Sequence, residues 1–346
     1  MSRLLTLVSS QTLRLLALLV VMAVLTLFFA SQIPDYINGR LFNRISSSVA
    51  IMALIATGQT LVILTRNIDL SVGSVVGFTA FALGGLVSAH PDLNPLLLVI
   101  FSAALGAGFG VVNGILVAYA RIPSIIVTLA TMALFRSGLV EYSGAKSITS
   151  TNLPSWLVEF PNRTVFALGE FEFRAGFVTS IILVLVVHAA LTSLRPARQF
   201  FAVGSNPEAA EMAGIDARRI VVTAFMVSGA MAGLAGFMFL ARFSNITVVA
   251  GLGFELKSVA SAVVGGVNIF GGSGSVIGAT LGAILVDLIE TSLVRWQFVN
   301  EFWQEAALGA LILCSVTADT LLSRRLAAYR ATGGTQNVPP ARKGAS

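Results

Sequence analysis

The chain has 346 residues, of which 56% are hydrophobic and only 11% are charged. A soluble domain carries about 25% charged residues, so this chain has too few polar side chains to cover a globule in water and is predicted to be a polytopic membrane protein. The net charge of +6 does not indicate nucleic-acid binding, because the basic residues cluster between apolar runs and at the chain ends.

Ten apolar runs follow in chain order, and each is a candidate for a membrane-spanning helix of roughly 20 residues. They are Leu13–Ala30, Val49–Thr65, Ser74–Val87, Leu96–Ala120, Ile125–Val140, Phe177–Leu194, Val221–Ala241, Leu256–Val267, Ser275–Val294 and Ala306–Leu322. The first run is interpreted as a helix and not as a secretory signal, because further spans follow it. The predicted fold is therefore an all-α, polytopic transmembrane bundle of about ten spans over residues 1–322. A basic tail at 323–346 is predicted to be disordered and cytoplasmic.

The distribution of Lys and Arg predicts the orientation of this bundle. Three basic regions fall on one side of a ten-span chain: residues before the first span, the loop at 195–219, and the tail after the last span. That side is predicted to be the cytoplasm, so both termini are cytoplasmic and the loop at 141–175 is external. Arg40 and Arg44 fall on the far side and weaken this pattern slightly.

One pattern occurs twice, at an offset of 201 residues: Asn-Ile, four residues, then Gly-Ser-Val-(Val/Ile)-Gly, starting at Asn67 and at Asn268. An internal repeat around broken hydrophobic segments indicates a transport pathway, although two ordinary helix–helix turns remain an alternative. With ten spans the repeat is parallel, and one miscounted span would make it inverted. The polar residue Asn113, in mid-span, suits either helix packing or the pathway. The candidate pathway residues are Asn67, Asp69, Ser71, Gly73, Asn113, Asn268, Gly271, Gly272 and Gly274.

The loop at 195–219 contains a predicted short helix. Asn206 suits its N-cap and Pro207 its first position, Glu208 suits its positive end, and Gly214 ends it. A free helix of about two turns is marginal in water, so we expect a partner to dock on it. The candidate coupling residues are Asn206, Glu208, Ala209, Ala210, Ala213 and Gly214.

Several motifs resemble one family. The string from Gly58 to Thr65, followed by Asn67 to Ser74, is similar to the permeases of bacterial sugar ABC importers, in the branch that serves ribose, xylose, rhamnose and the autoinducer sugar. Further matches are Asn113-Gly114, Ile122-Pro123-Ser124 with Val127-Thr128-Leu129, and Gly265-Gly266 with Gly271-Gly272. Glu208-Ala209-Ala210 followed by Gly214 resembles the Glu-Ala-Ala signature that engages the ATPase, but the Ile-x-Leu-Pro ending of the longer signature is missing.

The resemblance implies a permease subunit in the bacterial inner membrane that forms the pathway for a monosaccharide or related small sugar. Its implied partners are an ABC ATPase subunit that binds ATP and magnesium, a soluble sugar-binding protein and a second permease subunit, identical or different, in membrane lipid. The sequence contains no Gly-x4-Gly-Lys-(Ser/Thr) loop, so we expect no cofactor and no ATPase or other catalytic site in this chain. The alternatives are an ion-coupled secondary transporter, with Asp69, His188 or Asp287 as coupling group, and a membrane-embedded enzyme.

Overall fold

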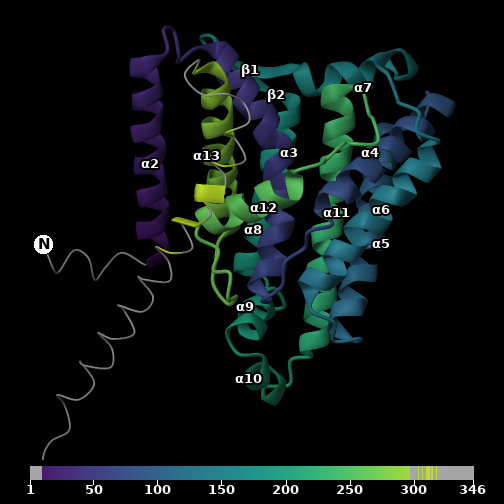
Figure 1. Cartoon of the computed structure of the whole chain (residues 1–346), viewed down its shortest axis with the longest axis vertical. Coiled ribbons are helices and arrows are strands. Elements are labelled where there is room, and N and C mark those ends of the chain that lie inside the picture. The colour runs from purple at the N-terminus through teal and green to yellow at the C-terminus, as the bar shows by residue number, and fades with distance from the viewer. Residues whose placement is uncertain are drawn as a thin grey trace, which may run out of the picture.

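A computed structural model describes residues 10–296 and, beyond them, residues 303, 306, 309–311, 313, 314 and 317. Within this part of the chain, eight helices are long and apolar enough to cross a membrane. They are α2 (Ser10–Gln32), α3 (Gly39–Leu64), α4 (Val72–Ala89), α5 (Pro95–Ala118), α6 (Ser124–Ser143), α8 (Ala175–Ser193), α11 (Ala217–Phe243) and α13 (Val276–Arg295). They stand side by side (Figure 1), which confirms the all-α polytopic bundle. The predicted tail at 323–346, and the last predicted span at 306–322 apart from a few isolated residues, lie outside the described residues.

The predicted span Leu256–Val267 is only a half-helix. The helix in this place, α12 (Phe254–Val264), has 11 residues. It therefore rises about 16 Å, whereas the hydrocarbon core of a bilayer is about 30 Å thick. The rest of this crossing is made by the loop at 244–253, which enters α12 through Gly253 in a left-handed conformation (φ +86°).

The repeated pattern lies between helices that run in the same directions in both copies. In each copy a helix that descends in Figure 1, α3 or α12, is followed by a break and an ascending helix, α4 or α13. The start of α13 lies near the end of α3, because Gly272 N donates to Leu64 O (3.0 Å). Its other end lies near the start of α3, where Arg295 donates to Tyr36 O (3.3 Å). The repeat is therefore parallel, as the ten-span count predicted.

Glycines allow α5 and α11 to pack closely. A Cβ added to Gly106 would overlap Gly229 O, and one added to Gly110 would overlap Phe225 O. Close backbone approach through small residues is the usual basis of helix packing in membranes. Gly108, in the same cluster, has nothing within 4 Å of an added Cβ and faces away from α11. The glycine-rich stretches of these helices therefore serve packing.

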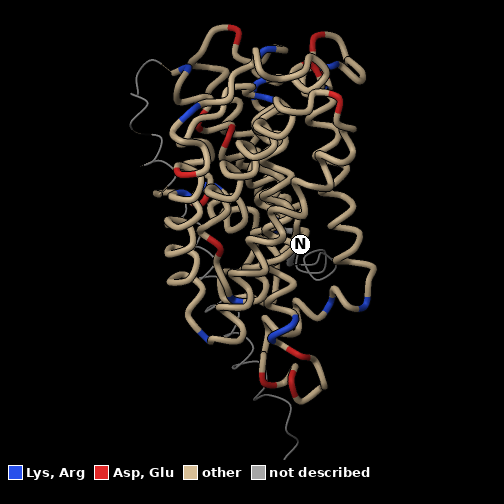
Figure 2. The backbone as a smooth tube through the Cα atoms, turned by 90° about the vertical axis from the view of Figure 1, so that its right-hand side faces the viewer, with Lys and Arg blue, Asp and Glu red and all other residues tan. Residues whose placement is uncertain are grey.

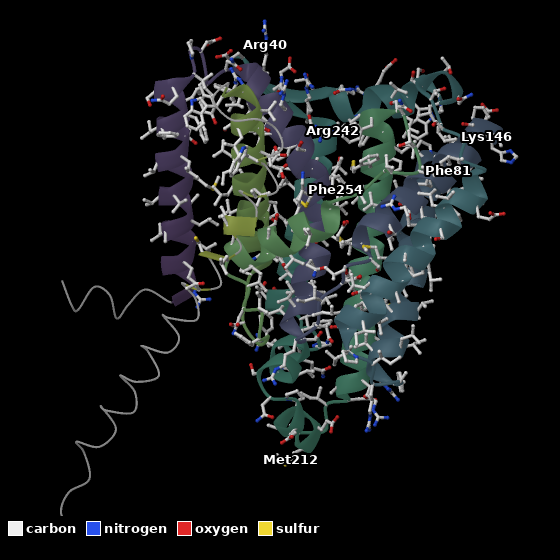
Figure 3. All side chains as sticks on the ribbon, in the orientation of Figure 1. Arg40, Phe81, Lys146, Met212, Arg242 and Phe254 are labelled. Atoms are coloured by element: carbon white, nitrogen blue, oxygen red, sulfur yellow. The ribbon has the colours of Figure 1, made fainter. Side chains whose placement is uncertain are left out.

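The two ends of the bundle differ. One end carries 3₁₀ helices η1 (Ser150–Asn152) and η2 (Phe160–Asn162), helix α7 (Ser155–Glu159), and an antiparallel hairpin of β1 (Thr164–Leu168) and β2 (Phe171–Arg174). The other end carries α9 (Arg198–Ser205) and α10 (Pro207–Met212). Figure 3 places Arg40 and Lys146 at the first end and Met212 at the second. Charged residues gather towards both ends, with a few along the bundle (Figure 2).

Candidate functional site

The first break, Asn67–Gly73, is centred on a buried carboxylate. Asp69 is only 1% exposed. Its Oδ1 accepts hydrogen bonds from Ser71 N (2.9 Å) and Ser71 Oγ (2.7 Å), and its Oδ2 accepts a longer one from Ser228 Oγ of α11 (3.5 Å). A buried carboxylate is tolerated only when its oxygens are hydrogen-bonded. These bonds therefore hold the break against α11.

Two further amide side chains close this cluster. Gln59 of α3, oriented so that both amide atoms are satisfied, donates to Asp69 O (3.1 Å) and accepts from Asp69 N (3.2 Å). Asn113 of α5 donates to Ser71 Oγ (2.8 Å), and its own Oδ1 is buried without a hydrogen-bond partner. Three helices are thereby tied to one irregular segment. Irregular backbone at membrane depth needs such partners, because lipid provides none.

A second close contact lies where α4 meets the start of α12. An added Cβ at Gly73 would overlap both Glu255 Oε2 and Gly251 O, so the start of α4 packs directly on the half-helix. Arg136 of α6 donates to Val248 O (2.9 Å) and Ala250 O (2.6 Å) of the loop that leads into α12. This arginine therefore supplies donors to carbonyls that the non-helical half of the crossing leaves open.

The second break, Asn268–Gly274, is held by its own backbone and by the end of α3. Asn268 N donates to Ser273 O (2.9 Å), and Asn268 Oδ1 accepts from Phe270 N (3.0 Å). Gly271 and Gly272 adopt left-handed conformations (φ +83° and +73°), which glycine allows without steric cost. In the first break, Asn67 donates to Thr65 O (2.8 Å). Both asparagines therefore satisfy backbone groups that a helix break leaves free.

The short helix predicted in the loop at 195–219 is present and is α10. Asn206 Oδ1 accepts from Ala209 N (3.1 Å), and Gly214 follows the helix in a left-handed conformation (φ +81°). Ala209 and Ala213 are exposed, but Ala210 is buried. Ala210 therefore faces the chain itself and cannot line a partner's cleft. Met212 is 84% exposed, and Figure 3 shows it at the tip of the bundle.

The structure gathers the predicted pathway residues into two groups. Asp69, Ser71 and Asn113 form one cluster, and Gly73 lies beside it at the start of α4, packed against α12. The second break lies instead at the end of α3, near the loop at 195–219. Sequence reasoning did not single out Gln59 and Ser228, or Arg136 and Glu255. Gln59 could have been found, because it is the only amide side chain within the predicted span Val49–Thr65.

A cavity of about 1040 Å³ lies elsewhere, between α5, α8 and α11 near α7. Leu96, Leu183 and Phe237 are among its apolar walls, and Trp156 and Arg163 are among its other lining residues. None of the predicted pathway residues lines it.

Several charged groups lie between the helices. Lys257 of α12 forms an ion pair with Glu290 of α13 (2.8 Å), and Arg242 of α11 donates to Ser48 Oγ (3.0 Å). The Oδ2 atom of Asp287 is buried without a hydrogen-bond partner. Among the described residues, no group of three or more His, Cys, Asp and Glu side chains is placed to hold a metal ion.

Comparison with known proteins assigns the chain to a family. Residues 41–316 match the family model described as branched-chain amino acid transport system / permease component. The chain is 36% identical over 296 residues to an autoinducer 2 import system permease protein LsrC of Yersinia enterocolitica, covering 84% of this chain and 79% of the relative. It is 35% identical to LsrC of Escherichia coli O9:H4 (86% and 85% covered) and 33% identical to LsrC of an Enterobacter species (93% and 92% covered). No solved structure matches the chain.

Proposed function

The chain belongs to the family of branched-chain amino acid transport system permease components and is a permease subunit of an ABC importer; from this premise we propose that it forms the pathway for a small sugar-like solute. The observation that carries the proposal is identity of 33–36% over 84–93% of the chain to permeases named for autoinducer 2 import. Autoinducer 2 is therefore the first substrate to test. The family description names branched-chain amino acids instead, which makes leucine the informative competitor.

The permease has no ATPase site of its own, so the energy for import comes from a partner. We assign that role to an ABC ATPase that binds ATP and magnesium on the cytoplasmic side. A soluble binding protein delivers the substrate from outside, and a second permease subunit completes the pathway. Binding of each partner to one of two conformations of the bundle would give alternating access.

The proposed orientation places α9 and α10 in the cytoplasm of a bacterial cell whose inner membrane the bundle crosses. Four arginines, two on each side of α10, support this placement through the excess of positive charge on cytoplasmic loops. They are Arg195, Arg198, Arg218 and Arg219. The chain enters α2 at the same end of the bundle (Figure 1), which supports a cytoplasmic N-terminus.

The two breaks are the proposed moving parts of the pathway. Transporter sites are typically built from interrupted helices near the middle of the membrane. Here the first break ends where Gly73, at the start of α4, packs on Gly251 and Glu255 in the interrupted crossing of α12. The second break lies at the end of α3. The buried cluster around Asp69 fixes one side of the junction at Gly73, so the polar residues of the first break act by holding backbone in place.

The docking element for the ATPase is proposed to be α10. Its exposed face presents Ala209, Ala213 and the strongly exposed Met212 to solvent. A flexible thioether side chain fits an apolar pocket on a partner, and the two alanines leave room for close approach. Glu208, also exposed, adds a rim charge worth only about 0–1 kcal/mol.

The deciding experiment is uptake by proteoliposomes that contain the permease, its ATPase and its binding protein. We expect uptake of labelled autoinducer 2 that requires internal ATP and is not reduced by excess leucine. Uptake driven by a proton or sodium gradient without ATP would instead support the secondary transporter, for which the unpartnered Asp287 Oδ2 is a candidate coupling group. ATP-dependent uptake of labelled leucine, without uptake of autoinducer 2, would overturn the sugar assignment and leave the importer assignment intact.

A further inference from the structure

Three segments that are far apart in the sequence meet at the cytoplasmic end of α3. Arg66, just after α3, donates from Nε to Gly204 O (2.5 Å) and from Nη2 to Ser205 O (2.7 Å), at the end of α9. Gly272 of the second break donates from its N–H to Leu64 O (3.0 Å). The residues at the end of α3 are thus hydrogen-bonded both to the end of α9, within the loop at 195–219 (here called the coupling loop), and to the second break.

The fit between these segments is close. A Cβ added to Gly204 would overlap Leu64 O, and one added to Gly272 would lie 2.5 Å from Ser205 Oγ. At Gly271 an added Cβ would lie 2.5 Å from Arg66 Cγ. Packed segments with no free space move together, because separate movement would open voids or break hydrogen bonds.

The backbone and the side chain of Arg66 are both suited to contacts with the end of α9. Its backbone is left-handed (φ +65°), which is uncommon for a residue other than glycine. Its guanidinium reaches carbonyls of the last turn of α9, which have no partner within that helix and lie at the negative end of the helix dipole. A planar guanidinium can donate to two such carbonyls at once, whereas an ammonium is a single point of charge.

We propose that Arg66 is a positioning residue that clamps the two breaks to the coupling loop. Only Asn206 separates α9 from α10, so a displacement of α10 is passed to α9 and then, through Arg66 and Gly272, to both breaks. This inference rests on the proposed docking of the ATPase at α10. Arg66 contacts backbone groups of α9. Its substitution should therefore change the amount of substrate imported per ATP and leave binding of the ATPase unchanged.

The test compares Arg66→Asn and Arg66→Lys in the complete importer, reconstituted with ATPase and binding protein. Asparagine tolerates the left-handed backbone, so Arg66→Asn removes the guanidinium without new strain. We expect this variant to bind the ATPase and hydrolyse ATP normally, while the amount of autoinducer 2 imported per ATP falls about tenfold or more, as expected for the loss of two charge-assisted hydrogen bonds. Arg66→Lys should recover part of this ratio.

Arg121→Asn is the matched control. Arg121 is also left-handed (φ +58°) and lies between α5 and α6, but its side chain is exposed and makes no hydrogen bond or ion pair to any residue that the structure describes. An importer with Arg121→Asn should import a normal amount of autoinducer 2 per ATP. An unchanged ratio in Arg66→Asn, or an equal loss in Arg121→Asn, would overturn the clamp.

Gly272→Ala tests the other half of the clamp. The added methyl group would push the second break away from Ser205, so import per ATP should fall here too. Gly169→Ala carries the same left-handed penalty (φ +63°) with nothing within 4 Å, and it should behave as wild type. Equal ratios in these two variants would contradict the proposal. Failure of the wild-type complex to import with ATP would refute the proposed function instead, whatever the variants do.

Discussion

Asp69 places a carboxylate inside a bundle that otherwise buries mostly apolar side chains. It is kept there by two bonds from Ser71, a weaker one from Ser228, and the pairing of its backbone with Gln59. Removing one partner of a buried hydrogen bond costs about 1–3 kcal/mol for each group left unsatisfied. The role of Asp69 is therefore to fix the first break, and this role needs hydrogen-bond acceptors more than it needs charge.

We therefore expect Asp69→Asn and Asp69→Ala to differ. Asparagine keeps an acceptor for Ser71 and nearly the same shape, so Asp69→Asn should keep most of the ATP-driven uptake. Asp69→Ala leaves two hydroxyl groups and one N–H without their acceptor and should lower the free energy of unfolding by about 2 kcal/mol or more. Thermal unfolding in nanodiscs and uptake assays measure the two effects.

Asp69→Asn also separates an ATP-driven importer from an ion-coupled secondary transporter. If Asp69 were the ion-coupling group of a secondary transporter, Asp69→Asn would abolish gradient-driven uptake while leaving the fold intact. An Asp69→Asn protein that is as stable as wild type but inactive would therefore speak against a purely positional role.

For single residues, the sequence predicted which ones are unusual but not which residues they contact. Asp69, Ser71 and Asn113 stood out as polar residues beside or within apolar runs. Their partner Ser228 is 159 residues from Asp69, and a serine in a glycine-rich span carries no signal of its own. The pairing is decided by how α3, α5 and α11 pack, which side-chain pattern alone does not specify.

Among the elements, α10 was predicted in full because its signals are local. The Asn206 cap, Pro207 and Gly214 act within one short segment. By contrast, α9 and the hairpin of β1 and β2 were not predicted. The hairpin is stabilised by distant contacts, such as Phe42 of α3 against Phe171 and Phe173 (ring centroids 5.6 and 5.0 Å apart). Elements that depend on tertiary packing cannot be predicted from the local sequence pattern.

Docking on α10 is testable by steric replacement. Ala209→Trp puts a large ring on the exposed face of α10, so it should block close approach of the ATPase and reduce its co-purification with the permease. Ala167→Trp is the matched control, because Ala167 is exposed on β1 at the opposite end of the bundle. Both variants should insert in the membrane normally. Wild-type co-purification and substrate-stimulated hydrolysis with Ala209→Trp would show that the ATPase docks elsewhere.

For the whole molecule, the number of crossings decides the direction of the repeat. Eight long helices and the half-crossing that contains α12 account for nine of the ten predicted crossings within the described residues. The sequence signalled α12 as a short run but did not show that half of its crossing is loop. That form depends on Arg136 and other groups of neighbouring helices that satisfy the free backbone, which a one-dimensional hydropathy pattern cannot reveal.

Topology mapping tests this arrangement in living cells. The sequence contains a single cysteine, so Cys314→Ser gives a background in which one new cysteine can be labelled at a time. A membrane-impermeant maleimide added from outside should label Lys146→Cys, in the loop before η1, and should miss Glu211→Cys on the exposed surface of α10. Both should react once the membrane is permeabilised, which controls for accessibility. Labelling of Glu211→Cys from outside would place α10 on the external face, and then neither an ATPase on α10 nor a clamp through Arg66 could operate, because ATP is hydrolysed in the cytoplasm.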